Sequence, residues 1–220
     1  MAKNSNYQTA KRERERLEKE AALKQAKRNK ILTWTLIPTA VAIIVALVVA
    51  LLSSLGAFGY KVTHTAKIVI DGYGTVELEL YGEEAPITVA NFVKLANEDY
   101  YDGSYFYRIV QGFMAQGGAG GSSDGTAATI KGEFSANGVN NPIKHERGVI
   151  SMARATSYNS ASASFFIMQQ ANENLDGNYA AFGKVTRGMD IIDRLCAGRN
   201  TDLTGQYYSI RILEVFVYEA

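Results

Sequence analysis

The stretch AKIVIDGYGTVELELYGEEAP, residues 66–86, decides the fold class of this chain. Its segment VELEL (76–80) alternates apolar and acidic side chains with a period of two, which is typical of a strand with one face in water. Asp71-Gly72 and Gly74 supply the residues that favour a tight turn just before this segment. The stretch therefore predicts a β-hairpin, and a chain that is mainly β from this point on.

Two helices and several more strands are predicted after the hairpin. Pro86 suits the first turn of a helix, and Val89, Phe92, Val93 and Ala96 recur at helical spacing after it. A second helix is expected near residues 187–196, with Met189, Ile192 and Cys196 on its apolar side. Short apolar runs typical of strands occur at YFYRIV (105–110), GVISMA (148–153), SFFIMQ (164–169), AAFGKV (180–185) and YSIRILEVFVYEA (208–220). Many short strands with two helices predict a closed antiparallel barrel whose ends the helices cover.

An uncharged apolar run, residues 31–55, precedes this domain. About 20 apolar residues cross the hydrocarbon core of a bilayer, so we expect a single transmembrane helix, with Trp34 as an interfacial anchor. A cleaved secretory signal is the alternative, but its basic and apolar regions are usually shorter. Residues 1–30 carry ten Lys/Arg against four Glu, which favours a cytoplasmic N-terminus. The sequence thus predicts a signal-anchor in the cell membrane, a tether at 56–65 and an extracytoplasmic domain at 66–220.

The N-terminal charged segment has the composition of a helix. Residues 7–30 are rich in good helix formers, with Glu and Arg or Lys spaced to pair along a helix surface. A solvated helix beside the membrane and a helix that contacts anionic lipids both fit this composition. Residues 60–220 carry thirteen Lys/Arg and eighteen Asp/Glu, and this mild acidity argues against nucleic acid as a partner.

The residues present give little support to hydrolytic or metal chemistry. His64 falls in the tether, His145 falls in a polar segment, and no nucleophile-elbow pattern accompanies either of them. Cys196 is the only cysteine, which excludes an intrachain disulfide and a cysteine zinc site, and we expect it on the buried face of its helix. The glycine cluster GGAGGSSDG (117–125) lacks the following Lys-Ser/Thr of a phosphate loop and is expected to be a mobile loop. We therefore predict no metal, no cofactor and a reaction that needs no proton-transfer group.

The segment FYRIVQGFMAQGG, residues 106–118, places one arginine and two glutamines among apolar and aromatic side chains. Rotation about an X-Pro bond suits such a set, because its barrier of about 18–20 kcal/mol comes from amide resonance. In the twisted state the proline nitrogen regains a lone pair, to which a permanently charged guanidinium donates a hydrogen bond. An apolar pocket must hold the proline ring meanwhile, so that only the acyl side rotates. The segment thus indicates transition-state stabilisation without any broken covalent bond.

Residues 66–218 resemble the cyclophilin-type peptidyl-prolyl cis-trans isomerases, in a bacterial, membrane-anchored form. The motifs that carry this resemblance are APITVANFVKLANEDYYDGSYFYRIVQGFMAQGG, GEFSANG, HERGVISMAR, SFFI and LDGNYAAFGKV. The resemblance implies an eight-stranded antiparallel barrel capped by two helices, with a proline pocket on its outer face. We also expect the catalytic domain to be monomeric.

Nine positions match the functional site of that family. Arg108 matches the catalytic arginine and Gln116 the glutamine that supports it, and with Phe113 they form the predicted catalytic set. Ala153 and Arg154 lie where the family binds the peptide backbone before proline. The full set of predicted substrate-binding residues is Met114, Ala153, Arg154, Phe166, Leu175 and Tyr179.

The chain also departs from the family pattern. Ser164 stands where the family has a glutamine, which shortens one hydrogen-bonding arm of the peptide groove. Tyr107 replaces a frequent histidine, with no obvious catalytic consequence, and the loop 156–163 is slightly longer than usual. Asn174 replaces a tryptophan of the cyclosporin-sensitive members, so we expect weak cyclosporin binding.

These features predict an isomerase of X-Pro bonds that assists the folding of newly exported proteins at the outer side of the membrane. A proline-peptide-binding module with little or no turnover is the alternative, and the short side chain of Ser164 favours it. The intact set of Arg108, Phe113 and Gln116 favours the enzyme. The predicted partners are proline-containing polypeptides and, through residues 31–55, the membrane.

Overall fold

The computed structural model describes residues 16–27, 43–44, 47, 59–119, 127–198 and 210–220. The chain divides into two units, Met1–Gly59 and Tyr60–Ala220. In the first unit residues 16–27 are helical and exposed, in agreement with the predicted charged helix. Apart from 43–44 and 47, the predicted span 31–55 lies outside the described residues. Within the described part of the chain, no helix combines the length and the apolar character needed to cross a membrane.

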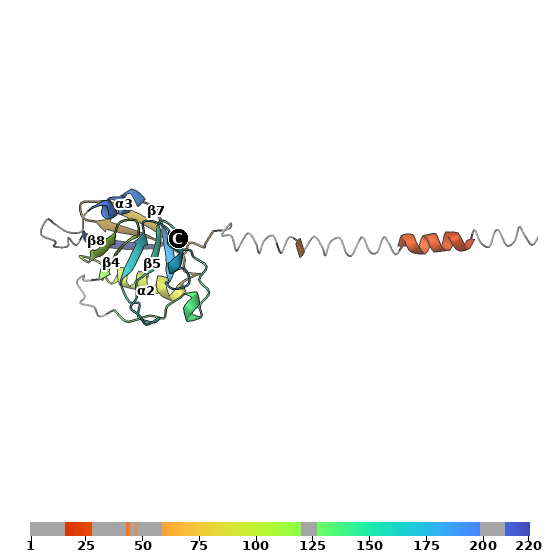
Figure 1. Cartoon of the computed structure of the whole chain (residues 1–220), viewed down its shortest axis with the longest axis horizontal. Helices are drawn as coiled ribbons and strands as arrows, with labels where there is room; N and C mark the ends of the chain where they lie inside the picture. Colours follow the sequence, from red (N-terminus) through yellow and green to blue (C-terminus); the bar gives the residue numbers. More distant parts are fainter. Residues whose placement is uncertain (1–15, 28–42, 45–46, 48–58, 120–126, 199–209) are drawn as a thin grey trace, which may run out of the picture. The chain divides into compact units, whose positions relative to one another are not determined.

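Eight antiparallel strands of the second unit close into a barrel, which confirms the predicted barrel (Figure 1). Around the barrel the strands follow the order β1-β2-β7-β5-β6-β4-β3-β8. Their bounds are β1 His64–Ile70, β2 Gly74–Leu80, β3 Tyr105–Val110, β4 Met114–Ala119, β5 Val149–Met152, β6 Phe165–Met168, β7 Ala181–Arg187 and β8 Ile210–Glu219. Each strand pairs with a neighbour on both sides, so the closed barrel offers no free edge for another chain to join.

Strands β1 and β2 form the predicted hairpin. Ile68 lies opposite Val76, and the Tyr73 backbone N–H donates to the Ile70 carbonyl at 3.1 Å to close the turn. Along β2 alternate side chains are buried in the core, as the period-two pattern requires. β1 starts at His64, because it pairs with both β2 and β8 along its whole length. The last two residues of the predicted tether, 64–65, therefore belong to the sheet.

Helices α2, Pro86–Asn97, and α3, Met189–Ala197, lie on opposite sides of the strands (Figure 1). In α3 the side chains of Ile192 and Cys196 are buried, as predicted, whereas Met189 is only half-buried. Burial raises the pKa of the Cys196 thiol to about 11, because the charged thiolate is poorly solvated there. Cys196 is thus a buried apolar residue.

The first turn of α2 is capped by a side chain from a distant loop. The residue before the helix, Ala85, provides no side-chain cap. Instead the carboxylate of Glu133, which is only 2% exposed, accepts from the Ile87 N–H at 3.0 Å and the Thr88 N–H at 2.8 Å. The Thr88 hydroxyl donates to the same carboxylate at 2.7 Å. Glu133 thus satisfies N–H groups that a helix start leaves free, and its charge complements the helix dipole.

The sequence pattern does not predict β4, because residues 117–119 belong to the glycine cluster that was expected to be a loop. A Cβ on Gly117 would lie 2.9 Å from the Tyr105 carbonyl oxygen, and one on Gly118 would lie 2.8 Å from the Phe165 ring. Gly118 also has a φ of +83°, which other residues rarely adopt. Glycine is needed here for close strand packing, so the loop prediction is wrong for 117–119. Residues 120–125 of the cluster lie outside the described part.

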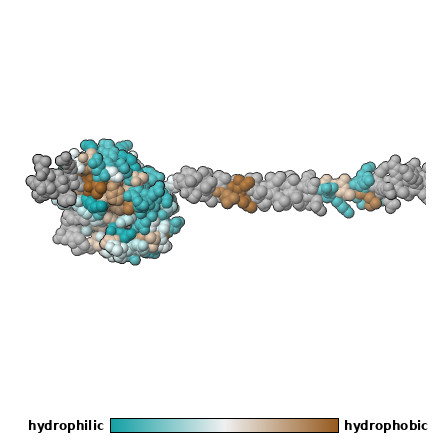
Figure 2. Space-filling view, viewed as in Figure 1, coloured by the Kyte–Doolittle hydropathy of each residue, from teal (hydrophilic) through white to brown (hydrophobic). Residues whose placement is uncertain are grey.

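The apolar residues of the barrel unit form two clusters. Every residue of β6 is buried, but Phe165 and Ile167 join the barrel core, whereas Phe166 and Met168 join a second cluster outside it. Met114 of β4 belongs to this second cluster. In Figure 2 the described residues of the barrel unit form a largely hydrophilic surface on the visible face, and apolar side chains gather there in one patch. The second cluster gives the outer face of the sheet a rigid apolar base.

Candidate active site

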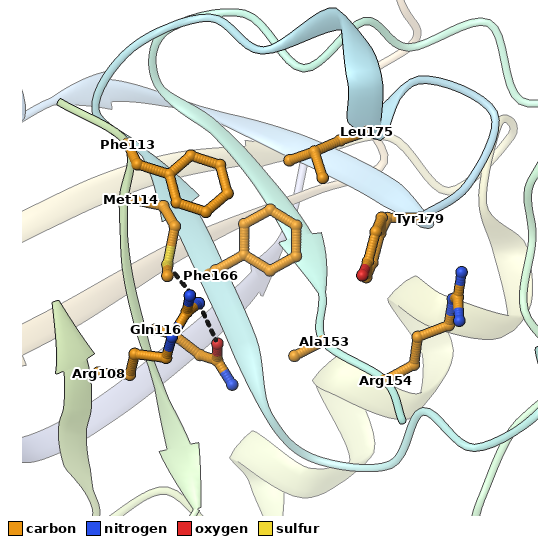
Figure 3. A pocket seen from close by; sticks show the side chains of 9 residues that line it. All are labelled: Arg108, Phe113, Met114, Gln116, Ala153, Arg154, Phe166, Leu175 and Tyr179. Carbon is orange, nitrogen blue, oxygen red and sulfur yellow. Dashed lines mark hydrogen bonds between the residues drawn. The ribbon is translucent and has the colours of Figure 1, made fainter. Parts of the chain in front are cut away.

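The nine residues predicted as site residues line one cavity of about 360 Å³ (Figure 3). They come from separate parts of the chain that the barrel brings together. β3 supplies Arg108 and β6 supplies Phe166, and the short helix η2, Glu173–Leu175, supplies Leu175. The other lining residues are Phe113, Met114, Gln116, Ala153, Arg154 and Tyr179. The predicted positions thus meet in space, while the role of each remains a prediction.

One side of the cavity is an apolar wall. Met114 and Phe166 are buried and belong to the outer cluster, and Phe113, Leu175 and Tyr179 pack against that cluster with part of their surface free. The rings of Phe166 and Tyr179 meet edge to face, with centroids 5.8 Å apart and an interplanar angle of 85°. This packing fixes the wall, which has the apolar character needed to hold a small saturated ring.

The guanidinium of Arg108 borders this wall and turns toward Met114 and Phe166 (Figure 3). Its NH1 group lies 3.4 Å from Gln116 Oε1 and 3.9 Å from Met114 Sδ. Both contacts are long for hydrogen bonds, so they hold the guanidinium only weakly. Arg108 can therefore donate to a group bound in the cavity.

Gln116 is held by a residue for which the sequence suggested no role. Its Nε2 group donates to the Tyr107 hydroxyl at 2.7 Å, and that hydroxyl donates to Ser164 Oγ at 3.1 Å. Tyr107 and Ser164 are two of the positions that depart from the family pattern, and here they contact each other. A tyrosine in place of histidine was visible in the sequence, but only the register of the sheet shows that its hydroxyl reaches Gln116.

Arg154 lies beside Tyr179, on the side away from Phe166 (Figure 3). Its Nε donates to the Asn178 carbonyl at 3.0 Å, and its NH1 donates to the carbonyls of the next two residues along the chain. The guanidinium also lies 4.6 Å from the ring centre of Tyr179 and 5.1 Å from that of Tyr158. These contacts engage Arg154 with its own chain and with the pocket wall, and its predicted contact with substrate stays a prediction.

His145, which the sequence places in a polar segment, is only 2% exposed. Its Nδ1 lies 3.1 Å from Asp176 Oδ1 and its Nε2 lies 3.0 Å from Ser151 Oγ. This order resembles a hydrolytic triad, but Ser151 is completely buried and its hydroxyl cannot reach a substrate. The imidazole stacks on Phe166, with centroids 6.0 Å apart. The three polar residues therefore support the pocket wall from behind.

Burial controls the charge of this polar group. It lowers the pKa of His145, an effect that the Asp176 carboxylate only partly offsets. Burial alone would raise the pKa of Asp176, but hydrogen bonds from the backbone and ring of His145 and the charge of Lys144 lower it overall. A neutral imidazole beside an ionised carboxylate follows, with the ring N–H directed to Asp176.

The chemistry available in the cavity is hydrogen-bond donation beside an apolar wall. Its described lining contains two arginines, one glutamine and one tyrosine, without a carboxylate, an imidazole or a thiol. Elsewhere in the described ranges, His, Cys, Asp and Glu side chains form no group of three or more that could hold a metal ion. The lining is suited to stabilising a polar, twisted state of a bound peptide.

Comparison with known proteins identifies the family. Residues 65–217 match the model of the cyclophilin type peptidyl-prolyl cis-trans isomerase family. Peptidyl-prolyl cis-trans isomerase B of Bacillus subtilis is 40% identical over 136 residues, which cover 61% of this chain and 92% of the relative. Peptidyl-prolyl cis-trans isomerase A of Dickeya dadantii is 36% identical over 167 residues, which cover 72% of this chain and 84% of the relative.

Solved structures show the same fold. A cyclophilin type isomerase of Cryptosporidium parvum superposes with a TM-score of 0.61 at 24% identity, over 72% of this chain and 99% of the other. The structure of the same protein in the presence of the dipeptide Ala-Pro gives a TM-score of 0.60 at 25% identity, over 71% and 99% of the two chains. The chain described here therefore belongs to the cyclophilin-type peptidyl-prolyl cis-trans isomerase family and is an isomerase.

Proposed function

We propose that the cavity catalyses rotation about X-Pro bonds in newly exported proteins at the outer side of a membrane. The observation that carries the chemical part is the position of Arg108, a weakly held cation at the edge of an apolar pocket. The C. parvum relative solved in the presence of Ala-Pro supports a proline-containing ligand for this pocket.

In the proposed reaction the apolar wall holds the pyrrolidine ring while the acyl group before it rotates. In the planar ground state the proline nitrogen shares its lone pair with the carbonyl and is a poor acceptor. In the twisted state the lone pair is localised, and the Arg108 guanidinium donates to it. Because this hydrogen bond exists only in the twisted state, it lowers the barrier without tightening substrate binding. A barrier lowered by about 7 kcal/mol corresponds to an acceleration of roughly 10⁵-fold.

An exchange assay tests this chemistry. We expect the full chain in mild detergent to accelerate cis-trans exchange of an Ala-Pro peptide, measured by NMR or by a protease-coupled assay. Arg108→Ala should lower kcat/KM by about 10²–10³-fold, the usual loss when one transition-state donor is removed. Arg187→Ala, at a side chain 80% exposed on β7, is the matched control and should leave kcat/KM unchanged. Binding of the peptide without faster exchange would instead support a proline-peptide-binding module.

The location outside the membrane rests on the sequence of the N-terminal unit. Residues 31–55 are uncharged and largely apolar, and the basic excess of residues 1–30 favours retention of that end in the cytoplasm. We expect the full chain, expressed in bacteria, to stay in the membrane fraction after an alkaline wash. Protease added outside spheroplasts should reach the barrel unit. Release of the chain by the wash, or protection of the barrel from protease, would contradict this location.

A further inference from the structure

Tyr107 occupies an irregular position in β3. Phe106 lies opposite Gly117 of β4, whereas Arg108 lies opposite Gln116, so Tyr107 is an extra residue between two adjacent pairs. In a regular strand neighbouring side chains point to opposite faces of the sheet. Here both Tyr107 and Arg108 are exposed. The irregularity thus places two consecutive side chains on the outer face beside the cavity, which is a common use of a β-bulge near a functional site.

The hydrogen bonds around Tyr107 run in one direction. Arg108 donates to Gln116 Oε1, Gln116 Nε2 donates to the Tyr107 hydroxyl at 2.7 Å, and that hydroxyl donates to Ser164 Oγ at 3.1 Å. A carboxamide has one accepting and one donating end, and a rotated Gln116 would turn its NH₂ group toward the Arg108 cation. The Tyr107 hydroxyl opposes this rotation. It donates its proton to Ser164 and accepts from Gln116 with a lone pair, so it has no proton left for a rotated carboxamide oxygen. Such a chain of donors also strengthens each of its members.

We propose that Tyr107 is a positioning residue of this isomerase, whose hydroxyl keeps the Gln116 carboxamide oxygen directed at Arg108 and links β3 to Ser164 beside β6. Tyr107 does not itself line the cavity, so its effect on the reaction passes through Gln116. The inference rests on the proposed function of the cavity. It also gives the short Ser164 side chain a role, because its Oγ accepts from the Tyr107 hydroxyl.

The test removes only the hydroxyl, with Tyr107→Phe in the full chain. We expect kcat/KM for the Ala-Pro peptide to fall by about three- to tenfold, the usual effect of one hydrogen bond. The midpoint of thermal unfolding should stay unchanged, since the ring remains in place. Tyr218→Phe on β8 is the matched control, because Tyr218 is 51% exposed and does not line the cavity. Its kcat/KM should equal that of the wild type.

A double-mutant cycle separates positioning from a direct effect. If Tyr107 acts through Gln116, then Tyr107→Phe should cost nothing further in a Gln116→Ala background. An equal fall in both backgrounds would overturn the proposal, and so would an unchanged kcat/KM for the single Tyr107→Phe variant.

The side-chain amide signals of Gln116 in NMR provide a second measurement that does not depend on turnover. They should shift in Tyr107→Phe and not in Tyr218→Phe, and unshifted signals would also overturn the proposal. A wild-type chain without exchange activity would refute the proposed function, whereas the amide signals would still decide the position of Tyr107.

Discussion

The contacts of Arg154 predict that this residue acts on substrate affinity through Tyr179. Its guanidinium donates to the Asn178 carbonyl just before Tyr179 and lies 4.6 Å from the Tyr179 ring centre. Arg154→Lys keeps the positive charge but removes the planar fork that bridges several carbonyls and stacks on the ring. The variant should therefore leave Tyr179 less well fixed, without a change at Arg108.

The size of the effect follows from the exposure of these groups. Arg154 is partly exposed, so each lost hydrogen bond is worth about 1 kcal/mol or less rather than the value of a buried charged pair. If the less well fixed Tyr179 weakens the free energy of peptide binding by about 1 kcal/mol, KM should rise about fivefold, because 1.4 kcal/mol is a factor of ten. The value of kcat should stay within about twofold, since the donor to the twisted nitrogen is untouched.

Full progress curves of the exchange assay at several peptide concentrations separate KM from kcat. Arg187→Lys, at an exposed arginine on β7, is the matched control and should match the wild type. A fall in kcat with an unchanged KM would refute the reasoning, because it would place Arg154 in the transition state. An unchanged KM together with an unchanged Tyr179 ring signal in NMR would refute it as well.

Three further predictions concern stability and ligand choice. Glu133→Gln should lower the free energy of unfolding by about 1–3 kcal/mol in urea titrations, since it removes a buried charged cap, while Glu98→Gln at the exposed end of α2 should not. The lowered pKa values of His145 and Asp176 mean that the unfolded chain binds more protons, so the thermal midpoint should fall as pH drops below 6.5 and further in the acid range. A His145→Gln variant should show a shallower fall between pH 6.5 and 5, and an identical slope would contradict this cause. Asn174 is exposed and does not line the cavity, so cyclosporin should bind weakly, and a submicromolar dissociation constant by calorimetry would contradict this.

Local patterns predicted most of the barrel, because most of its strands show either a period-two alternation of side chains or an apolar run. The alternation along β2 and the apolar runs of β5 and β6 are signals that a single sequence carries. β4 carries no such signal. Glycine is needed at 117 and 118 because a larger side chain would clash with Tyr105 and Phe165, which are not neighbours in the sequence. When a glycine is needed for close packing and not for a turn, composition alone wrongly indicates a loop.

The site was predictable as a set of positions but not as a set of orientations. The nine positions that the resemblance named all line one cavity, and their roles stay predictions. It did not show that Arg154 turns to carbonyls of its own chain, that His145 is buried behind Phe166, or that Tyr107 reaches Gln116. Each of these depends on a partner or a sheet register that no local motif contains.

The place of β8 in the barrel has a consequence for biosynthesis. This strand follows all the others in the chain, yet it pairs with both β1 and β3 and so supplies the last seam of the cylinder. Until its residues emerge from the ribosome, β1 and β3 each keep one unpaired side. The nascent domain therefore resembles an open cuff that closes only once β8 has been made, and until then this isomerase is itself a chain with exposed strand edges that needs protection.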